Sequence, residues 1–232
     1  MMDSFQAIRI FVLTAISFAA AMLWTPGLTY FLYKYKMGKQ IRDAETAPIM
    51  SKMHEKKAGT PTMGGILVWA TTLVLALVFA NFALLFDNHW LAALDFLSRS
   101  QTLLPLGVLV ASAIVGLVDD YYNVKRIGPH GGGLRMRHRL AIYTLIALVG
   151  AWWFYFKLNW DVVHVPFFGD LTVGWWIMPI FVFIIVATSF SVNETDGLDG
   201  LAAGTLLTCF GAYSIIAFTQ GKFELAAFCA VI

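Results

Sequence analysis

The hydrophobic residues of this chain fall into long, uninterrupted runs that are separated by short polar segments. Seven runs are visible, at 10–32, 63–86, 102–118, 140–156, 174–192, 201–218 and from 223 onward. Runs of about 17 to 25 apolar residues are long enough to cross the hydrocarbon core of a membrane as helices. The pattern therefore predicts an all-α, polytopic transmembrane bundle with six complete helices and the start of a seventh.

Two further features complete the predicted architecture. The seventh run continues for only ten residues before Ile232, and a half-span would leave carbonyl groups unsatisfied in lipid. We therefore expect 1–232 to be a single integral membrane domain that is truncated at its carboxyl end. Between the fourth and fifth runs, valines and phenylalanines surround Pro166 and Gly169. This segment predicts a small β-hairpin, turning near Gly169, on the extracytoplasmic side.

Composition and charge support a membrane protein and give its orientation. The chain is 59% hydrophobic and only 13% charged, which excludes an ordinary soluble domain, and its net charge of +2 does not indicate nucleic-acid binding. Seven Lys or Arg residues follow the first run and five follow the third, which is twelve of the sixteen in the chain. Because basic residues accumulate on the cytoplasmic side, the amino terminus is predicted outside and both basic loops inside.

The third apolar run ends on two adjacent carboxylates, Asp119 and Asp120. Such a pair repels itself and resists desolvation, so near lipid it needs a cation, a network of donors or water. A bound Mg²⁺ would satisfy that need, and a solvated pair that marks a helix end is an equally good alternative. Lys125 follows the pair, and a basic run ends at Arg139. Carboxylates that hold Mg²⁺ beside such cations suit a diphosphate.

A second polar cluster occupies 56–65, at the start of the second apolar run. It contains Lys57, Thr62 and three glycines around Pro61, a composition that allows close backbone approach to an anion. A Walker loop is excluded because Gly65 stands where lysine is required. The alternative interpretation is a helix start with Pro61 in its first turn.

A third polar cluster, 193–201, lies between the fifth and sixth runs. If it is helical, Asn193, Asp196 and Gly200 share one face, with Asp199 close to it. The alternative is a polar turn punctuated by Gly197 and Gly200. Together the clusters place five carboxylates on one membrane face, which favours metal-assisted chemistry on a phosphorylated substrate. A secondary transporter would instead carry its acids near mid-span.

These segments resemble the polyprenyl-phosphate N-acetylhexosamine-1-phosphate transferases, and more narrowly the phospho-N-acetylmuramoyl-pentapeptide transferases. The stretch 57–65 is the most discriminating match, while 119–121 and 193–201 match the wider superfamily. The resemblance implies an Mg²⁺-dependent, multi-pass enzyme of the bacterial plasma membrane. It would transfer phospho-N-acetylmuramoyl-pentapeptide from UDP-MurNAc-pentapeptide to undecaprenyl phosphate, giving lipid I and UMP for peptidoglycan synthesis.

The resemblance also implies roles for individual residues. Asp119 and Asp120 would be catalytic residues and metal ligands, and Asp199 a further catalytic acid. The residues implied in substrate binding are Lys57, Thr62, Asn193, Asp196 and Gly197, with Lys125 and Arg139 as further phosphate-binding cations. It also makes a homodimer an expected state, and a fragment of this length is expected to be inactive. A sister transferase that uses UDP-GlcNAc is the nearest alternative.

Three positions depart from the family pattern. The family often has lysine where Asn123 and Arg139 stand, and asparagine where Phe190 stands. Arg139 keeps the charge as a planar fork instead of a point charge. Asn123 and Phe190 lose a polar contact, which bears on substrate detail more than on the class of reaction.

Overall fold

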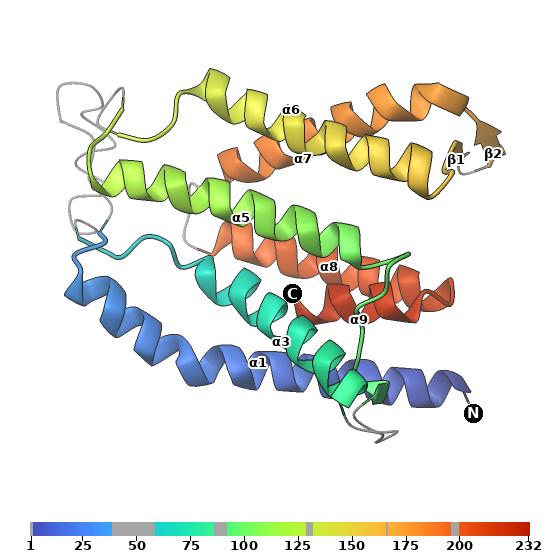
Figure 1. Cartoon of the computed structure of the whole chain (residues 1–232), viewed down its shortest axis with the longest axis horizontal. Helices are drawn as coiled ribbons and strands as arrows, with labels where there is room; N and C mark the ends of the chain where they lie inside the picture. The colour runs from blue at the N-terminus through green and yellow to red at the C-terminus, as the bar shows by residue number, and fades with distance from the viewer. Residues whose placement is uncertain (1, 39–58, 86–91, 129–131, 166, 196–199) are drawn as a thin grey trace. The chain divides into compact units, whose positions relative to one another are not determined.

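A computed structural model describes residues 2–38, 59–85, 92–128, 132–165, 167–195 and 200–232 (Figure 1). Six of its helices are long and apolar enough to cross a membrane, and only 6–22% of each span is buried inside the protein, as expected of helices that face lipid. The described residues also contain one short helix, two helical turns and a two-stranded sheet. The predicted polytopic all-α class is thereby confirmed. The chain divides into two compact units, 1–135 with 209–232 and 136–208.

The first unit is a group of packed helices. Helix α1 (Met2–Lys34) contacts α3 (Ile66–Leu85) and α9 (Phe223–Val231), and α3 contacts α5 (Leu103–Val124). Its buried core gathers near the amino-terminal half of α1. The core consists of Leu13, Ala76, Phe79, Phe96, Leu106, Ala227, Phe228, Cys229 and Val231. This core fixes the relative positions of the helices that carry the candidate site at their other ends.

Two buried polar side chains of α1 hydrogen-bond to distant parts of the first unit. Arg9 donates to the Gln6 side chain at 2.9 Å and to the carbonyl of Asp95 at 2.5 Å. The Ser17 hydroxyl donates to the carbonyl of Val231 at 2.6 Å. Because lipid supplies no hydrogen-bonding partner, such contacts are the means by which α1 tolerates polar residues in an apolar environment.

The second unit is built on the packing of α6 against α7. Helix α6 (Met136–Trp152) continues into a π-helical turn, η3 (Trp153–Lys157), and a 3-10 turn, η4 (Gly174–Trp176), precedes α7 (Ile177–Thr195). Helix α8 (Leu201–Thr219) begins in this unit and ends in the first.

Strands β1 (Val162–Val165) and β2 (Gly169–Thr172) connect the two helices of the second unit. They form an antiparallel pair in which Val162 lies opposite Thr172 and His164 lies opposite Asp170. The turn is closed by the Phe168 amide, which donates to the carbonyl of Val165. The predicted hairpin is confirmed.

The helices differ from the predicted runs mainly at their ends. Helix α1 begins eight residues before the predicted residue 10, because Arg9 finds partners within the protein. Helix α5 continues six residues beyond the predicted end at 118, so Asp119 and Asp120 lie inside it. Hydrophobicity locates where a helix enters lipid, whereas hydrogen bonds decide where it stops.

We expect Leu13→Ala to destabilise the first unit by roughly 2 kcal/mol. This lies at the lower end of the range for buried leucines, because lipid tails are as apolar as leucine and only packing is lost. Leu13 is 0% exposed, whereas Leu23 on the same helix is 87% exposed. Thermal unfolding in detergent should show a lower Tm for Leu13→Ala and an unchanged Tm for Leu23→Ala. Equal Tm values for the two variants would contradict the assigned core.

Candidate functional site

The aspartate pair lies in the last two turns of α5. Successive residues of a helix are rotated by about 100° around its axis, so the two carboxylates project in different directions. Both side chains are half-buried. Each accepts a hydrogen bond from the backbone of a different loop, and these two loops therefore define the surroundings of the pair.

Asp120 faces the loop 59–65, which leads into α3. The Met63 amide donates to Asp120 Oδ2 at 3.2 Å. Met63 has φ +68°, a left-handed conformation that costs a non-glycine residue about 1–3 kcal/mol and is often found at functional sites. The strained backbone at Met63 thus accompanies a direct contact with a predicted catalytic acid.

The end of α1 holds this same loop in place. The Thr62 amide donates to the carbonyl of Met37 at 2.8 Å, and Gly38 forms an antiparallel bridge with Pro61. The backbones approach so closely that a Cβ atom on Gly38 would lie 2.8 Å from Gly59 Cα. A side chain at position 38 would therefore push the loop away from Asp120.

Asp119 faces the segment 132–134, which follows α5. The Leu134 amide donates to Asp119 Oδ1 at 2.6 Å. Gly133 adopts φ +93°, and a Cβ atom there would lie 3.1 Å from both Asp119 Oδ1 and Asn123 Nδ2. A Cβ atom on Gly132 would likewise lie close to the backbone of Asn123. The glycines of this loop therefore allow its backbone to pack on the last turn of α5.

The structure brings together some of the predicted site residues. Thr62 is half-buried and adjoins Met63 in the loop that contacts Asp120. Lys125 is exposed immediately after α5, with its Nζ 6.0 Å from the centroid of the Tyr121 ring. These residues share one end of the first unit, where α1 and α5 end and α3 begins. Loops that follow the first and third spans thus meet, as the alternation of spans predicts.

The remaining predicted residues lie in the second unit or outside the described residues. Arg139, in α6, and Asn193, exposed in the last turn of α7, belong to the second unit. Lys57, Asp196, Gly197 and Asp199 lie outside the described residues. Because 196–199 lie outside the described residues, the shared face of Asn193, Asp196 and Gly200 stays a prediction.

Sequence reasoning missed the backbone contacts of the site. It emphasised side chains, whereas the contacts to the carboxylates come from the amides of Met63 and Leu134. It also missed the bridge from Gly38 to Pro61. The clustered glycines indicate that the backbone packs closely against another part of the protein. They do not specify which residue it contacts. Gly132 and Gly133 pack closely against α5 and do not border open space.

The donor chemistry of the pair fits a hard cation such as Mg²⁺. Two adjacent carboxylates supply oxygen ligands, and Mg²⁺ in proteins is commonly bound by one or two carboxylates together with substrate phosphates and water. Within the described residues no group of three or more His, Cys, Asp or Glu side chains gathers. Any Mg²⁺ held by Asp119 and Asp120 would therefore take its other ligands from substrate phosphates and water, as far as the described residues show.

Comparisons with known proteins match both parts of this cluster. A family model described as glycosyl transferase family 4 matches residues 102–232, and a signature described as phospho-N-acetylmuramoyl-pentapeptide-transferase signature 1 matches residues 57–67. The chain is similar to proteins named phospho-N-acetylmuramoyl-pentapeptide-transferase. That of Chloroflexus aggregans is 33% identical over 95% of this chain and 57% of its own length, and that of Shouchella clausii is 37% identical over 92% and 60%. The chain thus spans less than two thirds of the length of these relatives.

We expect the two carboxylates to protect different amides from hydrogen exchange. A hydrogen bond to a charged group contributes about 1.5–3 kcal/mol, so losing it should speed exchange of the freed amide by roughly 10- to 100-fold. In Asp119→Ala the peptide containing Leu134 should exchange faster and that containing Met63 should not. Asp120→Ala should show the reverse, and each variant serves as the control of the other. Mass spectrometry that finds both peptides changed alike in both variants would contradict this division.

Proposed function

Because the chain belongs to glycosyl transferase family 4, we propose that it acts in the transfer of a phospho-sugar to a lipid phosphate at the membrane surface. The donor would be UDP-MurNAc-pentapeptide and the acceptor undecaprenyl phosphate, and the products would be lipid I and UMP. The proposal rests on the names of the relatives and on the position of the signature segment. It applies to the protein in its full length.

One observation carries the proposal: the signature segment hydrogen-bonds to one member of the aspartate pair, Asp120. The signature covers 57–67, and the Met63 amide within it donates to Asp120. The two stretches are more than fifty residues apart in sequence, so this contact is a product of folding. A segment that distinguishes one branch of the family by sequence therefore adjoins the carboxylates best suited to its chemistry.

Asp119 and Asp120 are the residues that would hold Mg²⁺. When bound there, the cation would neutralise negative charge on the diphosphate of the donor. The hydrogen bonds from Leu134 and Met63 fix the orientation of the two carboxylates before substrate arrives. Phosphoryl transfer depends mainly on positioning and on charge neutralisation, so preorganised carboxylates are what the reaction requires.

The nucleophile is an oxygen of the lipid phosphate. It forms a bond to the β-phosphorus of the donor, and the bond from that phosphorus to the bridging oxygen breaks, which releases UMP. A phosphate monoester has a second pKa of about 6, so much of it is already dianionic at neutral pH and a strong base is unnecessary. One of the two aspartates would orient the attacking phosphate. Lys125, exposed immediately after α5, would attract phosphate.

The position of the acids favours this function over ion transport. Asp119 and Asp120 lie near the end of α5, beside the loops that connect spans, and not at mid-span. A site at a helix end can reach the head group of a lipid and a water-soluble nucleotide at the same time. Because these loops carry most of the basic residues, we propose that the site faces the cytoplasm of a bacterium and that the amino terminus faces outward.

The first test is UMP release by the full-length protein in detergent, with UDP-MurNAc-pentapeptide and undecaprenyl phosphate. Release should require Mg²⁺, disappear on chelation, and fall by roughly 100-fold or more in Asp119→Asn and in Asp120→Asn, because each removes a preorganised charge from the site. Asp95→Asn is the matched control, since Asp95 hydrogen-bonds to the Leu97 amide near the core. Release from UDP-GlcNAc alone would indicate a sister transferase, and no release from either donor would refute the proposal.

The loop packed on Asp119 gives a second test of the same reaction. In Gly133→Ala the new Cβ atom would lie 3.1 Å from Asp119 Oδ1 in a backbone conformation that alanine rarely adopts. We expect UMP release to fall about 10- to 100-fold, as for a displacement of about 1 Å at a reacting centre. Gly116→Ala is the control on α5, because a Cβ atom at position 116 would have no neighbour within 4 Å. Equal activities for the two variants would show that the loop does not position Asp119.

A further inference from the structure

Aromatic residues are concentrated around the hairpin of the second unit. Residues 152–176 contain ten aromatic residues in twenty-five positions, against 15% aromatic residues in the whole chain. Seven of them are exposed, and they are Trp152, Phe156, Trp160, Phe167, Phe168, Trp175 and Trp176. Tryptophan and tyrosine gather where membrane-spanning segments meet water, because their rings favour the head-group region. The enrichment here extends beyond the helix ends into the hairpin.

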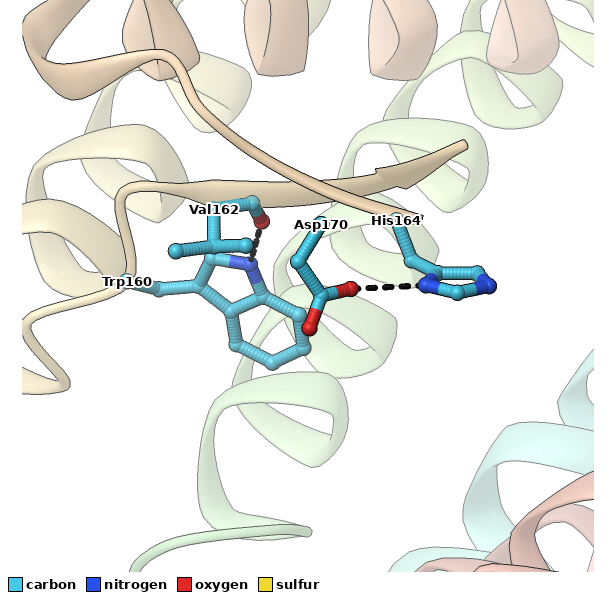
Figure 2. A network of polar contacts seen from close by, with 4 residues as sticks. All are labelled: Trp160, Val162, His164 and Asp170. Atoms are coloured by element: carbon cyan, nitrogen blue, oxygen red, sulfur yellow. Dashed lines mark hydrogen bonds and ion pairs between the residues drawn. The ribbon is translucent and has the colours of Figure 1, made fainter. Parts of the chain in front are cut away.

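The hairpin itself has two different faces. The register places His164 and Asp170 directly opposite each other, and their side chains project from the same side of the sheet as that of Trp160 (Figure 2). We call this side the polar face, and Val162 and Thr172, which lie opposite each other, also belong to it by alternation. The opposite side, the apolar face, carries Val163, Val165 and Leu171. The connection between two membrane-spanning helices is therefore an amphipathic sheet.

The tip of the hairpin, Phe167 and Phe168, exposes two adjacent phenylalanines. Phe167 is 104% exposed and Phe168 is 83% exposed, so neither packs on the protein. Phe167 also has φ +72°, a left-handed conformation that is unusual for a bulky side chain. Two uncovered phenyl rings in water are unfavourable, and a strained backbone that presents them requires a compensating partner.

We propose that the hairpin is an interfacial lipid anchor. It lies on the membrane surface with its apolar face and tip among the lipid head groups and upper acyl chains, and with its polar face toward water. The hairpin joins two helices of spanning length, so it lies at a membrane face whichever way the protein is oriented. Lipid is already the partner of the adjacent helices, and the same surface continues from them onto the hairpin.

Two polar contacts fit this position. His164 Nδ1 and Asp170 Oδ1 are 2.6 Å apart, so the carboxylate has a donor across the strands. This lowers the cost of holding a carboxylate close to lipid. At the end of the π-helical turn, Lys157 Nζ lies 5.7 Å from the centroid of the Trp152 ring. Lysine and tryptophan at a helix end are the residues that anchor a span at the interface.

Adjacent residues of β2 provide the test, because Leu171 and Thr172 are both exposed but lie on opposite faces. The full-length protein, with every native cysteine replaced, including Cys209→Ser and Cys229→Ala, would carry a single cysteine as Leu171→Cys, Thr172→Cys or Phe168→Cys. Each is labelled with an environment-sensitive fluorophore in vesicles of phosphatidylcholine and phosphatidylglycerol. We expect spin-labelled lipid to quench the label at 171 and at 168 several-fold more than at 172. Iodide in the water should give the reverse order.

Three outcomes would overturn the anchor. Equal quenching at 171 and 172 by iodide would place the whole hairpin in water. Equal quenching of both by lipid would mean that no face is turned toward water. Protection of 171 that disappears as protein is diluted with lipid would show that a second copy of the chain covers the apolar face. All three labelled positions are exposed, so the labels replace no packed side chain.

Discussion

The hydrogen bonds that tie two adjacent carboxylates to two different loops are the interactions on which the candidate site depends. An isolated pair of aspartates at a helix end would repel and turn toward water. Here the Leu134 amide holds Asp119 and the Met63 amide holds Asp120. Each loop is in turn restrained by close backbone packing, through Gly133 on α5 and through Gly38 beside Gly59. The charges are thus held in place by backbone, which is stiffer than flexible side chains.

The first unit separates the source of its stability from its candidate chemistry. The buried core and the hydrogen bonds of Arg9 and Ser17 lie toward the amino-terminal part of α1, whereas the aspartate pair adjoins the other end of that helix. Lipid forces this arrangement, because polar groups inside the bilayer must be paired within the protein while charged groups can be hydrated only at its edges. Because the helices are rigid, the packed core also fixes the positions of the helix ends that form the site.

Much of the fold and part of the site could be predicted from the amino-acid sequence. Six spans, the hairpin and the meeting of the loops after the first and third spans follow from apolar run length and alternation. Helix ends were less predictable: α5 continues to Val124 past two charges because loop amides donate hydrogen bonds to both carboxylates. The contacts of Met63 and Leu134 could not be predicted, since any backbone amide has the same chemistry and only its position selects a partner.

The sequence by itself determined that the protein is a polytopic helical bundle with carboxylates and glycine-rich loops at helix ends. Burial in lipid imposes that pattern locally, residue by residue, so it can be read without knowing the packing. Only the tertiary structure decided which loop meets which aspartate, that Gly132 and Gly133 pack on α5, and that the hairpin exposes Phe167 and Phe168. Those facts depend on contacts between residues distant in sequence, and no local pattern of hydrophobicity records them.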